Sequence, residues 1–187
     1  IFTAALASSN NVIVPSGTYK IKSVSVAANK NIITIGAVTI QQLSGVGTDE
    51  RTFVITGSNV SIGDMTIVGN ISTDTGEQRH GFFMRSSSSI KNITIGNITG
   101  KDIRGYIIYI GGTPTNKVTN VNIGNVTIDN VYRNGISVTG GENITIEGLT
   151  CISACGYGII DVEPNIATSQ LCDNIRIKYA KGRTILI

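Results

Sequence analysis

Two carboxylates, Asp161 and Glu163, lie two positions apart in a short apolar segment near the end of the sequence. Side chains along a β-strand point alternately to opposite faces, so a strand with Ile160 and Val162 in the core places both carboxylates outside. The opposite choice would bury two unpaired acids at a high desolvation cost. Residues two apart on a strand lie about 6.6–6.8 Å apart. Two carboxylates at this separation on one face are suited to acid/base cleavage of a glycosidic bond.

The roles of these two acids depend on the separation of their carboxylate oxygens. Side-chain rotation can set the oxygens near about 5.5 Å or out toward about 9 Å, so retaining and inverting hydrolysis both stay open. Mutual repulsion should raise the pKa of one acid, which would then serve as the proton donor. The alternative is a pair of solvated surface acids. Against it, Asp and Glu are scarce, with 12 in 187 residues.

Other side chains are expected on the same outer face as the acid pair. Aligning the inward apolar residues of preceding segments, such as Ile136 with Ile160, brings rings and hydroxyls into line with the acids. The predicted sugar contacts on this face are Phe83, Arg85, Tyr109, Ser137 and Thr139. Exposed aromatic rings beside hydroxyls form a suitable sugar groove, because flat rings stack on pyranose faces. The alternative for Phe83 is cover by a loop or a subunit contact.

Two further candidates stand just before apolar segments of this kind. His80 is the only histidine, and it could act as a general acid or base or bind sugar. A lone loop histidine is also commonly structural or simply exposed. Arg133 could hold an acidic sugar or a catalytic carboxylate through paired hydrogen bonds. Its alternative is an ion pair at the surface or in the interior.

The elements that would position these residues form an internal repeat. Asn followed by Ile or Val, any residue, and Ile recurs every 23–33 residues. The anchors of this repeat are Asn59, Asn92, Asn120, Asn143 and Asn174, with a looser copy at Asn31. β-Branched residues alternate with polar ones, which is typical of strands. Leucine is scarce and no long helical period is present, which excludes a helical array or a leucine-rich solenoid.

Each repeat holds a second strand before its anchor, a tight corner at the Asn, and a longer loop after the anchor strand. One such unit cannot bury its own apolar face, but parallel stacking at about 4.8 Å lines up the inward Ile and Val. The predicted fold is therefore all-β: a single-stranded right-handed parallel β-helix (solenoid) of about 6–7 coils. The repeated Asn is expected to form a side-chain ladder that caps backbone groups at the corner.

A single domain is expected over residues 1–187. Residues 1–22 predict an opening coil and N-terminal cap, with a weak helix at 3–9 and a strand, turn and strand at 11–22. Residues 23–187 hold the coils. The apolar C-terminus shows no comparable cap, and an uncovered parallel edge is an aggregation hazard. We therefore expect a fragment of a longer chain, or an end that another domain or subunit covers.

The composition narrows the classes of partner. Charged residues make up 14% of the chain, against roughly 25% in an average globular protein, and the net charge of +3 is scattered, so no nucleic-acid footprint is present. Apolar runs are far shorter than the roughly 18 residues that cross a bilayer, so no membrane insertion is predicted. The three cysteines fit neither zinc spacing nor a disulfide framework and are expected in the core. No cofactor is predicted.

Several motifs together carry a resemblance to a known family. Residues 2–21, ending in Val12-Ile13-Val14-Pro15-Ser16-Gly17-Thr18-Tyr19, resemble the opening coil of the pectate-lyase-like superfamily, which includes bacteriophage tailspike depolymerases. The order of three later motifs is similar to that in tailspikes: Tyr132-Arg133-Asn134-Gly135-Ile136-Ser137-Val138, Glu142-Asn143-Ile144-Thr145-Ile146 and Gly158-Ile159-Ile160-Asp161-Val162-Glu163-Pro164-Asn165. Asn165, the end of the last motif, joins the predicted sugar contacts.

The resemblance implies a phage tail spike in the virion, a homotrimer that binds and cleaves bacterial surface polysaccharide, either capsule or lipopolysaccharide. One alternative is a non-catalytic carbohydrate-binding or structural β-helix of a spike or adhesin, secreted or on the cell surface. Another is a polysaccharide lyase, which often needs calcium held by an acidic cluster. No cluster of three acids is visible in the sequence, so hydrolysis without a metal is the expectation.

Overall fold

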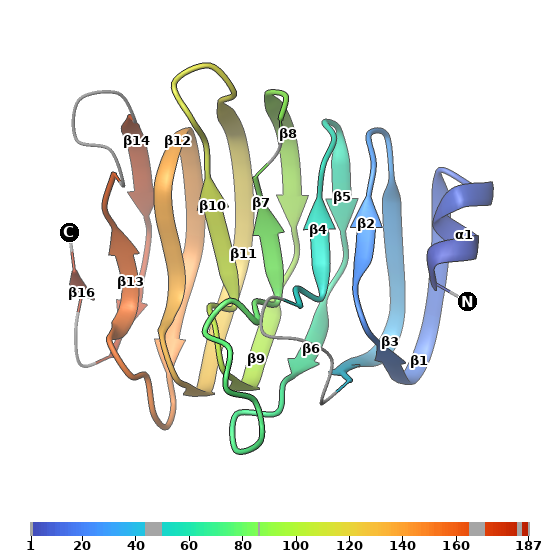
Figure 1. The fold of residues 1–187 in the computed structure, drawn as a ribbon, viewed down its shortest axis with the longest axis horizontal. Helices are drawn as coiled ribbons and strands as arrows, with labels where there is room; N and C mark the ends of the chain where they lie inside the picture. Colours follow the sequence, from blue (N-terminus) through green and yellow to red (C-terminus); the bar gives the residue numbers. More distant parts are fainter. Residues whose placement is uncertain (1, 44–49, 86, 165–170, 183–184, 187) are drawn as a thin grey trace.

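The computed structural model describes residues 2–43, 50–85, 87–164, 171–182 and 185–186. Apart from one short helix, α1 (Phe2–Ser8), its regular elements are strands, and the protein is all-β. The strand pairs are parallel. Figure 1 shows the strands following one another along the long axis, from the N-terminus at the right to the C-terminus at the left.

Short strands line one side of the molecule, and we call them the short-strand face. They are β2 (Val24–Val26), β4 (Phe53–Ile55), β7 (Phe82–Met84), β10 (Ile108–Gly111), the first part of β12 (Asn134–Cys151), β13 (Gly158–Val162) and β16 (Ile185–Leu186). Each pairs with the strand that follows it in this order. The chain therefore returns to the same face after each intervening stretch.

The other strands form the long-strand face. They are β1 (Asn11–Ile21), β3 (Asn31–Gln42), β5 (Val60–Ile62), β6 (Met65–Val68), β8 (Ile90–Ile95), β9 (Ile98–Ile103), β11 (Val118–Val131), the second part of β12, β14 (Cys172–Ile177) and β15 (Ala180–Lys181). Strand β12 runs from one face to the other and joins the described strands into one 16-stranded parallel sheet. This arrangement is compatible with the predicted β-helix.

Columns of apolar side chains fill the space between the two faces. On the short-strand face Ile108, Ile136 and Ile160 align in register, and all three are fully buried. The rings of Phe53 and Phe82 stack at 5.3 Å between centroids in the same interior. Burying such side chains is the main favourable term in folding. The predicted inward positions are thus confirmed. The three cysteines are free and half-buried, and they pack at the margin of this core rather than inside it.

The first described residues pack at the N-terminal end of the strands. Helix α1 buries Phe2 and Leu6, and the Phe2 ring lies 6.0 Å from the Phe53 ring between centroids. Strand β1 then pairs with β3, with an irregularity between Pro15 and Gly17 where a turn was expected. The apolar end of the first coil is therefore covered by the chain's own N-terminal segment.

The asparagine ladder is present on the long-strand face, just before β3 and β5 and within β8, β11, β12 and β14. Its members have left-handed φ angles of 50–61°, and the side-chain N–H of each member donates to the amide oxygen of the preceding member in all but one of the steps between them. They are Asn29, Asn59, Asn92, Asn120, Asn143 and Asn174. The looser copy was misplaced, since Asn29 rather than Asn31 begins the ladder. Asn31 instead donates to Asn11 at 3.2 Å.

A second ladder, which the asparagine repeat did not predict, lies at the bend between β5 and β6 and at the bend between β8 and β9. The backbone N–H of Asn97 donates to Asp64 Oδ1 at 2.7 Å, and that of Asn125 donates to Asn97 Oδ1 at 2.9 Å. Side chains there satisfy backbone donors that the bend removes from strand pairing. Polar ladders therefore support two kinds of bend on the long-strand face, and the second ladder runs from Asp64 through Asn97 to Asn125.

Candidate functional site

The outward residues of the short-strand face form a column that ends at the acid pair. Phe83 pairs with Tyr109, Tyr109 with Ser137, and Ser137 with Asp161. We call these four residues the outer column. Neighbouring strands lie about 4.8 Å apart, so the column is about 14 Å long. The predicted alignment of this face is confirmed strand by strand.

The acid pair lies at the C-terminal end of the outer column. Asp161 is partly buried on β13, whereas Glu163 lies just beyond the strand and is exposed. The backbone N–H of Glu163 donates to the Val138 carbonyl at 3.0 Å, which carries the strand pairing past β13. Both residues thus stay on the coil next to Ser137, as the period-two pattern predicts.

Burial raises the pKa of Asp161, and the nearby Glu163 carboxylate raises it further. Two groups oppose this shift: the Ser137 hydroxyl, whose Oγ donates to Asp161 Oδ2 at 3.5 Å, and the Arg133 charge. The expected repulsion between the acids is therefore present, but desolvation is the larger cause. Burial therefore favours the protonated form of Asp161 relative to a free aspartic acid.

The expectation of an exposed aromatic surface was wrong for Tyr109. Its side chain is only 8% exposed, because its ring stacks on Phe83 at 5.1 Å and its hydroxyl lies 2.8 Å from Thr139 Oγ1. Ser137 and Thr139 are buried as well, while Phe83 is half-buried. Stacking on the outer face thus closes most of the surface that was predicted to contact sugar.

The covering rings come from loops before β7 and β10. His80 stacks on Phe83 at 5.7 Å and on Tyr106 at 5.0 Å, and Tyr106 lies 5.8 Å from Tyr109. We call His80, Phe83, Tyr106 and Tyr109 the aromatic stack. The alternative for Phe83, cover by a loop, fits this arrangement. Tyr106 was not singled out in the sequence, although it stands where His80 stands one coil earlier.

His80 itself is fully buried, which favours its structural alternative over contact with sugar. Its Nδ1 accepts a hydrogen bond from the Tyr106 backbone N–H at 3.0 Å, so the ring proton sits on Nε2, 3.1 Å from Gln78 Oε1. Burial, with the charges of Arg51 and Arg133, lowers the pKa of His80 to about 3. The imidazole is therefore a neutral spacer in the stack.

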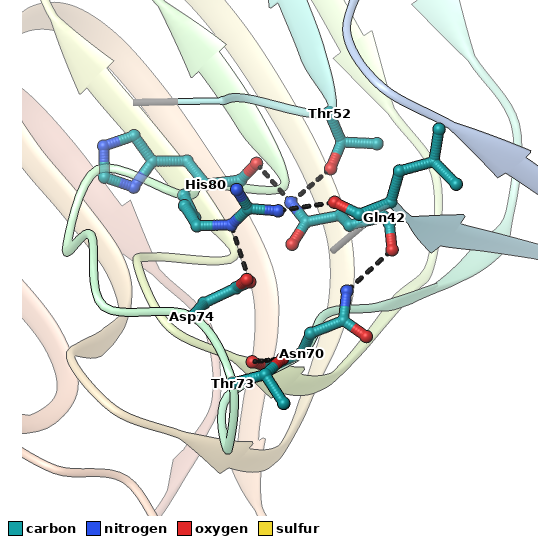
Figure 2. Close-up of polar contacts among 8 residues, drawn as sticks. Gln42, Thr52, Asn70, Thr73, Asp74 and His80 are labelled. Atoms are coloured by element: carbon teal, nitrogen blue, oxygen red, sulfur yellow. Dashed lines mark hydrogen bonds and ion pairs between the residues drawn. The ribbon is translucent and has the colours of Figure 1, made fainter. Parts of the chain in front are cut away.

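A buried ion pair fastens the loop that carries His80. Arg79 Nε lies 2.6 Å from Asp74 Oδ2, and both side chains are 2% exposed. Arg79 Nη2 also donates to the Leu43 carbonyl at 2.7 Å. Figure 2 shows this pair, with the His80 ring pointing away from Asp74. Charges so deep in a protein persist only when paired and hydrogen-bonded.

The same loop is tied to the preceding coil by amide side chains (Figure 2). Gln42 Nε2 donates to the His80 carbonyl at 2.9 Å, and Asn70 Nδ2 donates to the Gln42 carbonyl at 2.7 Å. No pattern in the sequence indicates this network, because its members are far apart in the chain and follow no repeat. It explains why the loop lies firmly against the short-strand face.

Two arginines border the aromatic stack. The Arg51 guanidinium carbon lies 4.3 Å from the Phe83 ring centroid, and that of Arg133 lies 5.0 Å from the Tyr106 centroid. Arg133 Nη1 also lies 3.0 Å from Glu77 Oε2, so the ion-pair alternative holds for one of its nitrogens. Arg51 was missed, although it precedes β4 much as Arg133 precedes its own strand.

The remaining candidates add little to this cluster. Arg85 is exposed just after β7. Asn165 lies outside the described residues. Within the described ranges, no three His, Cys, Asp or Glu side chains gather where they could hold a metal ion. In the same part of the chain, no helix is long and apolar enough to cross a membrane.

Comparisons of the chain with protein-family models, with curated proteins and with solved structures found no match.

Proposed function

We propose that this protein binds a polysaccharide along the outer column and cleaves it by acid/base hydrolysis at Asp161 and Glu163. The observation that carries this proposal is the position of the acid pair, side by side at the end of a column of rings and hydroxyls. Asp161, whose pKa is raised by burial, is the proton donor. Glu163, exposed beside it, is the base or nucleophile.

In the proposed reaction Asp161 gives its proton to the glycosidic oxygen as the bond to the anomeric carbon breaks. Glu163 either takes a proton from a water that adds to that carbon, or attacks the carbon itself to give a covalent intermediate. In the second case water later releases the sugar, with Asp161 acting as base. Positioned acid/base groups contribute about 10² to 10⁴ in rate.

The same proposal includes the finer fold and the setting. The parallel stacking and the opening-coil resemblance support a right-handed parallel β-helix of the pectate-lyase-like type, most like phage tailspike depolymerases. The substrate is then a bacterial capsule or lipopolysaccharide, and the protein a homotrimeric part of the virion. Cleavage by a lyase is less favoured than hydrolysis, because among the described residues no third acid lies beside Asp161 and Glu163.

A second candidate is a carbohydrate-binding or structural β-helix without cleavage. The burial of Tyr109 and Ser137 favours it, because a closed surface next to the acids leaves less room for a sugar ring. Incubation with capsules and lipopolysaccharides from a panel of hosts separates the two. A fall in viscosity with one polymer supports hydrolysis, whereas intact polymer throughout supports binding alone. An unsaturated uronate in the products would point to a lyase.

Two isosteric variants test the catalytic assignment. Asp161→Asn and Glu163→Gln should each lower the cleavage rate about 10² to 10⁴-fold. Because neither side chain is in the core, the free energy of unfolding should change by no more than about 0.5 kcal/mol. Polymer binding should persist. Cleavage at the parent rate in both variants would show that Asp161 and Glu163 are solvated surface acids. A joint loss of melting temperature and activity would show that the pair has a structural role.

A further inference from the structure

Two arginines border the aromatic stack on the short-strand face, one before β4 and the other before β12, three strands further along. Arg51 precedes β4 and Arg133 precedes β12, yet both charges act on the His80 ring between them. Arg51 stacks on Phe83 and Arg133 on Tyr106, and His80 lies against both of these rings. Two guanidinium groups thus flank a single stack of rings.

These two cations are not equally neutralised. Arg133 has Glu77 as its partner at 3.0 Å. For Arg51 no carboxylate lies within ion-pair distance among the described residues, and the neighbouring Glu50 pairs instead with Lys22 at 3.4 Å. The Nε atoms of both arginines are buried without a hydrogen-bond partner in the same part of the chain. A half-buried guanidinium without a counter-ion favours an anion beside it.

The outer column is therefore charged unequally along its length. Its Phe83 end carries Arg51 and the exposed Arg85. Its other end carries Asp161 and Glu163, and the Arg133 charge that acts on Asp161 there is paired with Glu77. Three strand spacings, about 14 Å, separate Phe83 from Asp161. A negatively charged sugar unit is attracted at the first end and repelled by like charges at the second. Such a field fixes how an anionic polymer is placed on the column.

We propose that Arg51 binds the carboxylate of an acidic sugar, so that the substrate is a carboxylated polysaccharide lying along the outer column. This inference rests on the proposed function and names its substrate class. The carboxylated unit lies at the Phe83 end, and the bond that is cleaved lies at the acid pair. A guanidinium fork matches a planar carboxylate with two parallel hydrogen bonds, which a neutral sugar does not offer.

Matched polymers test this assignment on the full chain. Hyaluronan, polygalacturonate and carboxylated host capsules are each compared with the same polymer after reduction of its carboxyl groups to alcohols. Binding is measured with the Glu163→Gln variant, so that cleavage does not consume the probe. At least one carboxylated polymer should bind about tenfold or more tightly than its reduced form at low salt. The preference should shrink as salt is added.

Arginine variants in the same background locate the contact. Arg51→Gln should lose about tenfold in affinity for the carboxylated polymer and leave the reduced polymer unaffected. Arg104→Gln is the matched control, because Arg104 is also half-buried and stacks on a ring, that of Tyr132 at 3.7 Å. Its affinities should equal those of the parent. Melting temperatures of both variants show whether either is unfolded.

Two results overturn the inference: no carboxylated polymer binds better than its reduced form, or Arg51→Gln weakens both forms equally while remaining folded. Failure of the proposed function has a different signature. In that case the wild-type chain prefers the carboxylated polymer but cleaves neither form. Cleavage of a neutral polymer without any charge preference would instead remove the inference and keep the hydrolase.

Discussion

His80 is buried in surroundings that disfavour its charged form. Burial and two arginine charges lower its pKa from 6.5 to about 3. Below pH 6.5 the unfolded chain binds a proton that the folded chain refuses, so protons favour unfolding. The stability that neutral His80 contributes is therefore complete above about pH 6.5 and is lost as the pH falls toward about 3.

This chain has one histidine, so its titration can be followed directly. We predict that the His80 ring resonances stay constant from pH 8 to pH 5, and that the melting temperature falls between pH 7 and pH 5. His80→Phe removes the titrating group and should flatten part of that fall. A ring that titrates with a midpoint near 6.5 would contradict the buried, neutral assignment.

At the scale of the element, the asparagine ladder combines side-chain hydrogen bonds with a left-handed backbone. Asn92 has a φ of 60° and links Asn59 to Asn120 by amide hydrogen bonds. Asn92→Ala should lower the free energy of unfolding by about 2–3 kcal/mol, from about 1–2 for the left-handed backbone and about 1 for the lost bonds. Asn92→Gly should lose only the second part.

Urea unfolding of these variants checks the ladder prediction. Asn122→Ala is the matched control, because Asn122 is exposed on β11 at an ordinary strand position and should shift stability by at most about 0.5 kcal/mol. Equal losses in Asn92→Ala and Asn122→Ala would mean that the corner contributes nothing special. If Asn92→Gly were as unstable as the alanine variant, the left-handed backbone would contribute nothing to the difference in free energy of unfolding.

The loop between β6 and β7 depends on the Asp74–Arg79 ion pair. Asp74→Asn leaves the Arg79 charge buried without its counter-charge and should cost about 3–5 kcal/mol of unfolding free energy. Glu77→Gln removes the exposed partner of Arg133 and should cost at most about 1 kcal/mol. Chemical denaturation compares the two. Similar small losses would show that the loop is held by its amide hydrogen bonds instead.

Local patterns in the sequence correctly predicted which face of a strand each side chain lies on. They did not predict which of these side chains are covered by loops. The alternation around Ile160 fixed which way Asp161 points, since a shift by one residue would bury a carboxylate. The spacing of anchors likewise predicted the ladder, but not that Asn29 begins it. The burial of Tyr109 could not be predicted, because it depends on loops that bring His80 and Tyr106 over the face. Contacts of this kind produce no periodic pattern in the sequence.

For the whole molecule, an apolar patch on the first coils bears on the proposed homotrimer. Ile13, Ile33 and Ile35 are 61%, 38% and 56% exposed on β1 and β3, where Ile13 pairs with Ile33. Closed threefold symmetry would let subunits bury such patches together. We predict a trimer by sedimentation, and a shift to monomer in Ile33→Lys. Ile152→Lys, 62% exposed on a distant loop, is the control. A parent that stays monomeric at high concentration would remove this prediction.

The direction of the strand pairing has a mechanical consequence. Strands lie across the long axis, so the hydrogen bonds between coils run along it (Figure 1). A tensile load on the two termini therefore opens one interface between coils at a time, starting from an end, rather than shearing the whole sheet. Each release of a coil of 23–33 residues frees about 80–120 Å of chain. The molecule therefore unfolds one coil after another under load, and the hydrogen bonds of the amide ladders break separately at each step.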